Sequence, residues 1–86
     1  MDNLLFVDSH ERERLQREVG RAFKLARLRA GLTQGEVASL MGVTQPWVSK
    51  VEKSARQLGI VEAWKLAEIL DVDLEKIKAA CFEREL

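Results

Sequence analysis

Five polar side chains have the types and the spacing to hydrogen-bond to DNA: Gln34, Gln45, Ser49, Lys50 and Lys53. The amide of Gln45 carries a donor and an acceptor, so it can pair bidentately with N6 and N7 of adenine. Lys50 can reach O6 and N7 of guanine, and the hydroxyl of Ser49 can serve a base or a phosphate. Lys53 lies toward the end of the same stretch, where phosphate contacts are expected. We therefore interpret this segment as a surface that reads double-stranded DNA.

Four further residues of the same region are candidates for DNA contact: Thr44, Pro46, Trp47 and Arg56. Pro46 has no side-chain hydrogen bond to give, so it could make only an apolar contact, for example with a thymine methyl group. Two placements are open for Trp47, packing back across a turn or lying on the sugar-phosphate backbone, and we favour packing. Arg56 is either a phosphate contact or an ordinary surface charge.

The order of capping and turn residues from 33 to 53 predicts two helices joined by a tight turn. Thr33 and Glu36 form a capping box, in which hydroxyl and carboxylate satisfy the free amides of a helix start. Gly42 can adopt the left-handed conformation that ends this helix. Thr44 can cap a second helix, whose first turn tolerates Pro46 because the amides there have no intrahelical partner. This is the pattern of a helix-turn-helix, whose second helix enters a major groove.

These residues and their surroundings resemble the lambda-repressor-like family of phage and bacterial regulators, the XRE type. The resemblance covers roughly residues 20 to 73 and rests on the segments RLRAGLTQ (27–34), EVA (36–38), GVTQ (42–45), VSKVE (48–52), RQL (56–58) and LAEILDVD (66–73), with Glu62 between the last two. The chain departs from the family pattern at Ser54, where glycine is usual, and at Leu74, where proline is common.

The resemblance implies two sets of contacts. In similar regulators the glutamine that matches Gln34 hydrogen-bonds to the one that matches Gln45 and to phosphate, which holds the base-reading amide in its orientation. The resemblance also implies that Arg27 and Glu52 meet as a structural salt bridge, which clamps the first helix to the third and does not touch DNA. Such a pair specifies geometry more than it stabilises, because desolvation offsets much of the attraction.

The rest of the sequence has helical periodicity. We therefore expect an all-α fold, a five-helix lambda-repressor-like DNA-binding domain with an extended first helix that runs from a cap at Asp8 to about Ala30. The fourth helix should run from Gly59 to Leu70 with Ile60, Ala63, Trp64, Ala67 and Leu70 buried. The fifth, within residues 73–86, should start after Asp73 and carry an apolar stripe of Leu74, Ile77, Ala80, Cys81 and Phe82. Residues 1–7 are expected to form an N-terminal arm, in which Leu4 to Val7 is the one segment that could be a strand.

Composition limits the classes of function. The 86 residues are 47% hydrophobic, which suffices for one compact domain, residues 1–86. One cysteine and one histidine cannot build an ordinary metal site, so we expect no metal and no cofactor. Nothing pairs a nucleophile with a base, so an enzyme is rejected. Without a membrane span or a signal peptide, we expect a cytoplasmic protein.

The net charge is zero, but the charge is unevenly distributed along the chain. Residues 21–56 hold seven Lys and Arg against two Glu, whereas residues 57–86 hold four basic against seven acidic residues. The basic charge therefore coincides with the helix-turn-helix, as expected for phosphate binding. Ordinary solvated helix faces are the alternative explanation.

The stripe on the fifth helix suggests a homodimer, because surplus apolar area at a terminus is usually covered by a partner. A dimer of this kind would read a palindromic operator. The alternative is that the fifth helix and Leu4 to Val7 both pack on their own subunit. We predict a DNA-binding transcriptional regulator that acts as a repressor. The rival hypothesis is an antitoxin or adaptor that binds a protein partner through its acidic C-terminal third and regulates its own operon.

Overall fold

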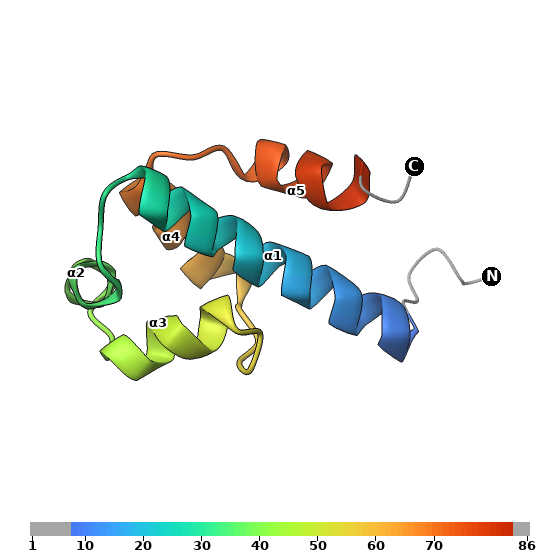
Figure 1. Cartoon of the computed structure of the whole chain (residues 1–86), viewed down its shortest axis with the longest axis horizontal. Coiled ribbons are helices and arrows are strands. Elements are labelled where there is room, and N and C mark those ends of the chain that lie inside the picture. The colour runs from blue at the N-terminus through green and yellow to red at the C-terminus, as the bar shows by residue number, and fades with distance from the viewer. Residues whose placement is uncertain (1–7, 84–86) are drawn as a thin grey trace.

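The computed structural model describes residues 8–83, and side chains up to residue 81. Five helices follow one another in this range: α1 (Ser9–Arg29), α2 (Gln34–Met41), α3 (Gln45–Glu52), α4 (Ile60–Leu70) and α5 (Leu74–Glu83) (Figure 1). No strand occurs among the described residues. The all-α fold and the long first helix are confirmed. The expected N-terminal arm, with Leu4 to Val7, and the side chain of Phe82 lie outside the described residues.

The helix ends follow from the capping residues. Asp8 accepts a hydrogen bond from the amide of Glu11 (2.8 Å) at the start of α1. The Thr33–Glu36 capping box is complete, since the Thr33 amide donates to the Glu36 carboxylate (2.8 Å) and the Glu36 amide donates to the Thr33 hydroxyl (3.0 Å). Gly42 ends α2 at φ +74°, in the left-handed conformation that the turn requires.

The core lies where α1 crosses the other helices. In Figure 1, α1 runs across the middle of the molecule with α5 above it and α3 below it. The buried apolar side chains that form one cluster are Phe23, Ala26, Val37, Ala38, Val48, Val51, Leu66 and Leu70. Because Val48 and Val51 belong to this cluster, the apolar face of α3 is fixed on the core and its opposite face is left to solvent.

The structure shows how serine is accommodated at position 54, where the family usually has glycine. It follows α3 with φ +62°, a left-handed conformation that glycine adopts without cost and other residues rarely adopt. The Ser54 hydroxyl donates to the carbonyl oxygen of Gln16 in α1 at 2.8 Å. We infer that this long-range bond offsets part of the conformational cost and ties the end of α3 to α1.

The predicted buried face of α4 is partly wrong. Ile60 and Trp64 are 62% and 61% exposed, whereas Leu66, which was not predicted, is buried with Ala67 and Leu70. The face of α4 through Leu66, Ala67 and Leu70 meets the core, and Ala63 packs partly against it. The aromatic side chain of Trp64 is consequently left on the outside.

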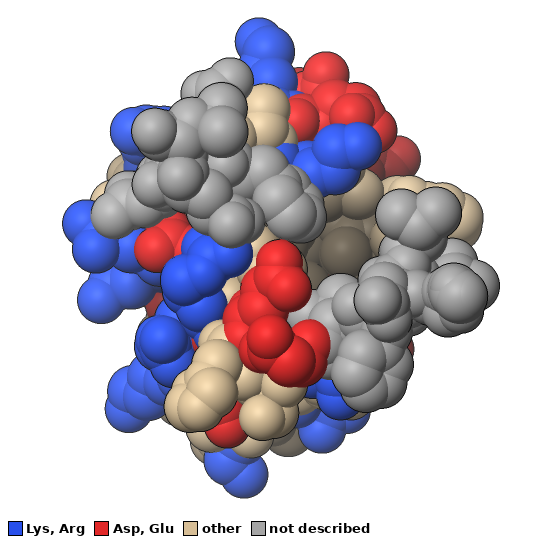
Figure 2. Space-filling view, turned by 90° about the vertical axis from the view of Figure 1, so that its right-hand side faces the viewer, with Lys and Arg blue, Asp and Glu red and all other residues tan. Residues whose placement is uncertain are grey.

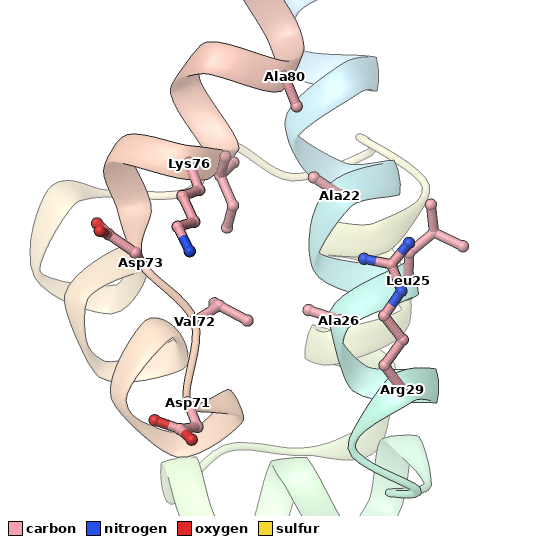
Figure 3. Close-up of a pocket in the computed structure, with 10 residues that line it drawn as sticks. Ala22, Leu25, Ala26, Arg29, Asp71, Val72, Asp73, Lys76 and Ala80 are labelled. Carbon is pink, nitrogen blue, oxygen red and sulfur yellow. The ribbon is translucent and has the colours of Figure 1, made fainter.

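Part of the predicted apolar stripe of α5 packs on its own chain, while Ala80 stays exposed. Cys81 is only 3% exposed, and Leu74 and Ile77 are half-buried against the core. Figure 3 shows an open groove between α1 and α5, with Ala22, Ala26 and Ala80 on its walls. This groove lies on the side of α1 opposite α3, so it is not part of the surface on which the DNA-reading side chains were expected (Figure 1).

Candidate nucleic-acid interface

The two helices of the helix-turn-helix cross closely, and α3 lies at the edge of the molecule (Figure 1). The Val43 amide donates to the carbonyl oxygen of Ala38 at 3.0 Å, which closes the turn. Ala38 is 4% exposed, and its small side chain lets the helices approach. The α3 residues that the structure leaves exposed are Gln45, Pro46 and Lys50, with Lys53 just after the helix, while Ser49 is half-buried.

Gln34 and Gln45, which were predicted to pair, do so. The Nε2 atom of Gln45 donates to Oε1 of Gln34 at 2.5 Å. Gln45 is exposed in the first turn of α3, and Gln34 is half-buried at the start of α2. The pair therefore holds an amide at the N-terminal end of α3, the part of a recognition helix that approaches base edges.

Arg27 and Glu52 form the expected salt bridge between α1 and α3. Arg27 Nε lies 2.6 Å from Glu52 Oε2 and Nη2 lies 3.1 Å from Oε1, so the contact is bidentate. The side chains are 9% and 5% exposed. Arg27 Nη1 also donates to the carbonyl oxygen of Leu32 at 2.9 Å, just before α2. The pair thus holds together α1, the start of α2 and the end of α3.

One contact of the site was missed by the sequence analysis. Gln34 Nε2 donates to Glu52 Oε1 at 2.9 Å, so the salt bridge and the glutamine pair belong to one hydrogen-bonded chain. Residues 34 and 52 are on different helices, and no local pattern links them. Only the crossing of α2 and α3 brings the amide of the first to the carboxylate of the second.

The tertiary structure decides between the two placements of Trp47. Its ring is half-buried and packs against the core cluster, so packing is confirmed. The guanidinium carbon of Arg56 lies 5.3 Å from the centre of the ring, within the range of a cation–π interaction. Thr44 caps α3 by accepting from the Trp47 amide at 3.3 Å. Trp47 and Thr44 therefore have structural roles, whether or not they also contact DNA.

Cations and carboxylates are partly separated on the surface. Figure 2 looks onto the end of the molecule where α1 begins, and most Lys and Arg side chains in this view follow one side, whereas Asp and Glu gather toward the top and the centre. Lys50, Lys53 and Arg56 are all exposed. Because phosphate binding responds to the local charge, these three cations can act on DNA although the net charge is zero.

Comparison with known proteins agrees with this geometry. A family model described as helix-turn-helix matches residues 23–77. The structure is similar to the clp gene regulator ClgR from Corynebacterium glutamicum, with 17% identity and a TM-score of 0.76 over 81% of this chain and 74% of that chain. It is also similar to the restriction-modification controller protein C.AhdI from Aeromonas hydrophila, with 29% identity and a TM-score of 0.67 over 72% and 94% of the two chains.

A mutant of a second restriction-modification controller protein, C.Esp1396I, has 23% identity and a TM-score of 0.72 over 80% of this chain and 92% of that chain. No curated protein matches the sequence. The fold and the site define a helix-turn-helix protein of the class of DNA-binding transcriptional regulators. The chain belongs to the lambda-repressor-like, XRE-type helix-turn-helix family. The fold and family are those of regulators rather than enzymes, and no helix among residues 8–83 is long and apolar enough to cross a membrane.

Proposed function

We propose that this protein is a cytoplasmic, sequence-specific regulator that acts as a homodimer on a palindromic operator and represses by blocking the promoter. The observation that carries the proposal is the hydrogen bond between Gln34 and Gln45, which fixes a base-reading amide at the exposed start of α3. A protein that used this fold only as a scaffold would have no need to orient an exposed amide.

The proposed contacts follow from position. Gln45 pairs with adenine, Lys50 reaches guanine, and Pro46 makes an apolar contact. Gln34, Ser49 and Lys53 bind phosphate or, for Ser49, a base. Arg56 is a phosphate contact that its stacking on Trp47 holds in place. Thr44 lies at the N-terminal end of α3, where its exposed backbone and hydroxyl are near the DNA in this arrangement.

The outer face of α4 supports the homodimer. Three of the six large apolar side chains that are exposed among the described residues lie close together there: Ile60 (62%), Val61 (66%) and Trp64 (61%). An apolar patch at neighbouring positions of one helix is suited to burial against a partner. Cys81 of the α5 stripe is buried in its own chain, whereas this α4 patch is exposed, so we place the subunit contact on α4.

The charges beside this α4 patch fit a second copy of the chain. Val61 and Trp64 share a shallow hollow with Lys65 and Glu68, which are one turn apart. In a two-fold contact the same patch meets itself, so Lys65 of one copy can face the partner's Glu68. A strongly acidic or strongly basic partner could not pair with both Lys65 and Glu68. A two-fold dimer also presents two copies of α3 to half-sites about one helical turn, ~34 Å, apart.

Selection of bound sites from random duplexes tests the proposed function. We expect a palindromic consensus whose binding weakens steeply as the salt concentration rises, because cations on the protein displace counterions from phosphate. A scrambled duplex of the same length is the control. Enrichment of no consensus by the folded protein would overturn sequence-specific binding.

The second candidate is an antitoxin or adaptor that binds a different protein and regulates its own operon. The exposed α4 patch is the observation that favours it, because such a patch could also hold a foreign partner. Sedimentation of the purified protein separates the two hypotheses. A protein that is dimeric by itself on the selected palindrome supports the regulator, whereas a protein that stays monomeric, with its α4 patch uncovered, favours the antitoxin or adaptor.

A further inference from the structure

Three side-chain contacts connect the buried salt bridge to the exposed base-reading amide. Arg27 donates to Glu52, Gln34 donates to the same carboxylate, and Gln45 donates to Gln34. The three distances are 3.1, 2.9 and 2.5 Å, and they lead from a nearly buried pair to an exposed residue on α3. The orientation of each side chain in this series therefore constrains the orientation of the next.

Glu52 sets the direction in which these side-chain hydrogen bonds are donated. A carboxylate only accepts hydrogen bonds, so the Gln34 atom that faces Glu52 must be the nitrogen, Nε2. The amide oxygen of Gln34 then faces Gln45, which must offer its own nitrogen. Gln45 is left with its oxygen and one N–H group for DNA. Without the carboxylate, both amides could turn over, and Gln45 would present two N–H groups instead.

These two arrangements suit different bases. In the major groove adenine offers a donor, N6, beside the acceptor N7, whereas guanine offers two acceptors, O6 and N7. One acceptor and one donor on Gln45 match adenine, and two donors match guanine. We propose that Glu52 is a positioning residue that fixes the direction of the Gln34–Gln45 hydrogen bond and thereby makes Gln45 select adenine over guanine. This inference rests on the proposed function, since it concerns how the same site reads DNA.

The Glu52→Gln variant tests the proposal, with binding measured on the selected operator and on versions that carry each other base at the position read by Gln45. An amide at position 52 can still accept from Arg27, but it no longer dictates which atom of Gln34 it faces. A bidentate contact supplies a preference of about 5-fold to 150-fold, and we expect Glu52→Gln to reduce the adenine-to-guanine ratio by about 3-fold or more. The ratio at other positions should stay unchanged.

Two matched variants separate positioning from a loss of stability. Arg27→Lys weakens the same salt bridge but leaves the chain from Glu52 to Gln45 intact, so it should keep the adenine preference. The double variant Gln34→Glu with Glu52→Gln moves the carboxylate to position 34, where it again accepts from Gln45. We expect this double variant to recover the adenine preference even if its affinity for all duplexes falls.

Circular dichroism confirms first that each variant is folded. If Glu52→Gln does not fold, Gln34→Leu, which leaves the salt bridge in place, decides the question: loss of the adenine preference in this variant supports the proposal. An unchanged adenine-to-guanine ratio in folded Glu52→Gln, or in Gln34→Leu, would overturn it. Failure of the proposed function has a different signature, because then the unmodified protein would select no consensus at all.

Discussion

Gly20 in α1 lies so close to Val51 in α3 that a Cβ atom on residue 20 would stand 2.7 Å from the Val51 carbonyl oxygen. The carbonyl oxygen of Glu52 and the hydroxyl of Ser54 would lie within 2.9 and 3.0 Å of the same atom. The end of α3 therefore rests with its backbone directly on α1. Absence of a side chain at position 20 is what permits this contact.

We expect Gly20→Ala to lower the free energy of unfolding by about 1–3 kcal/mol, because the added methyl group must push the backbone of α3 away from α1. Chemical denaturation measures the change. Gly35→Ala is the matched control, since the nearest atom to a Cβ there is the Thr33 hydroxyl oxygen at 3.9 Å, and it should leave stability unchanged or slightly raised. Equal stability of the two variants would show that α1 and α3 are less tightly apposed than described.

Gln45→Ala should weaken binding to the selected operator by about 1–3 kcal/mol and relax the preference at one base pair in each half-site, because a bidentate base contact is lost. Binding titrations with single-base variants of the operator measure both effects. Fold should be retained, since Gln45 is exposed and its one described side-chain bond is to Gln34. A folded variant with unaltered base preference would remove Gln45 from the reading surface.

Lys53→Ala should weaken specific and non-specific duplexes about equally and reduce the slope of log affinity against log salt by roughly one unit per half-site, because one phosphate contact is lost. The measurement is a salt titration with each duplex. Lys78→Ala is the control, since Lys78 lies on α5, on the opposite side of α1 from α3, where it pairs with Glu75 at 3.4 Å. A loss confined to one sequence at constant slope would instead make Lys53 a base reader.

Trp64→Glu should dissociate the dimer while the subunit keeps its helical content, because this position is 61% exposed in the single chain but would bury an unpaired carboxylate between two copies. Operator affinity should fall as two half-sites are no longer held together. Sedimentation and circular dichroism measure assembly and fold. Leu28→Glu, at an apolar residue of α1 with 53% exposure, should not change assembly. A Trp64→Glu variant that stays dimeric would exclude the α4 patch as the interface.

Local sequence signals determined the helices and the turn between α2 and α3. Thr33, Glu36, Gly42 and Thr44 act within one turn of their own positions, so their chemistry can be read from sequence, and the structure has them as predicted. The roles of Gln45 and Lys53 on DNA remain predictions, although the structure leaves both side chains exposed.

Only the tertiary structure decided which face of a helix is buried and which residues far apart in sequence are in contact. Trp64 was expected inside and lies outside, because the apolar residues of α4 allow two faces and only the packing of the core selects the one with Leu66. The α5 stripe fitted a subunit contact or an internal one. Within the chain Cys81 is buried and Leu74 and Ile77 are half-buried, and the subunit contact remains a prediction. The hydrogen bond from Gln34 to Glu52 joins residues on two different helices, and no local sequence pattern predicts it. Capping and turn formation depend on residues near in sequence, whereas burial and hydrogen-bond direction depend on which helices meet in space.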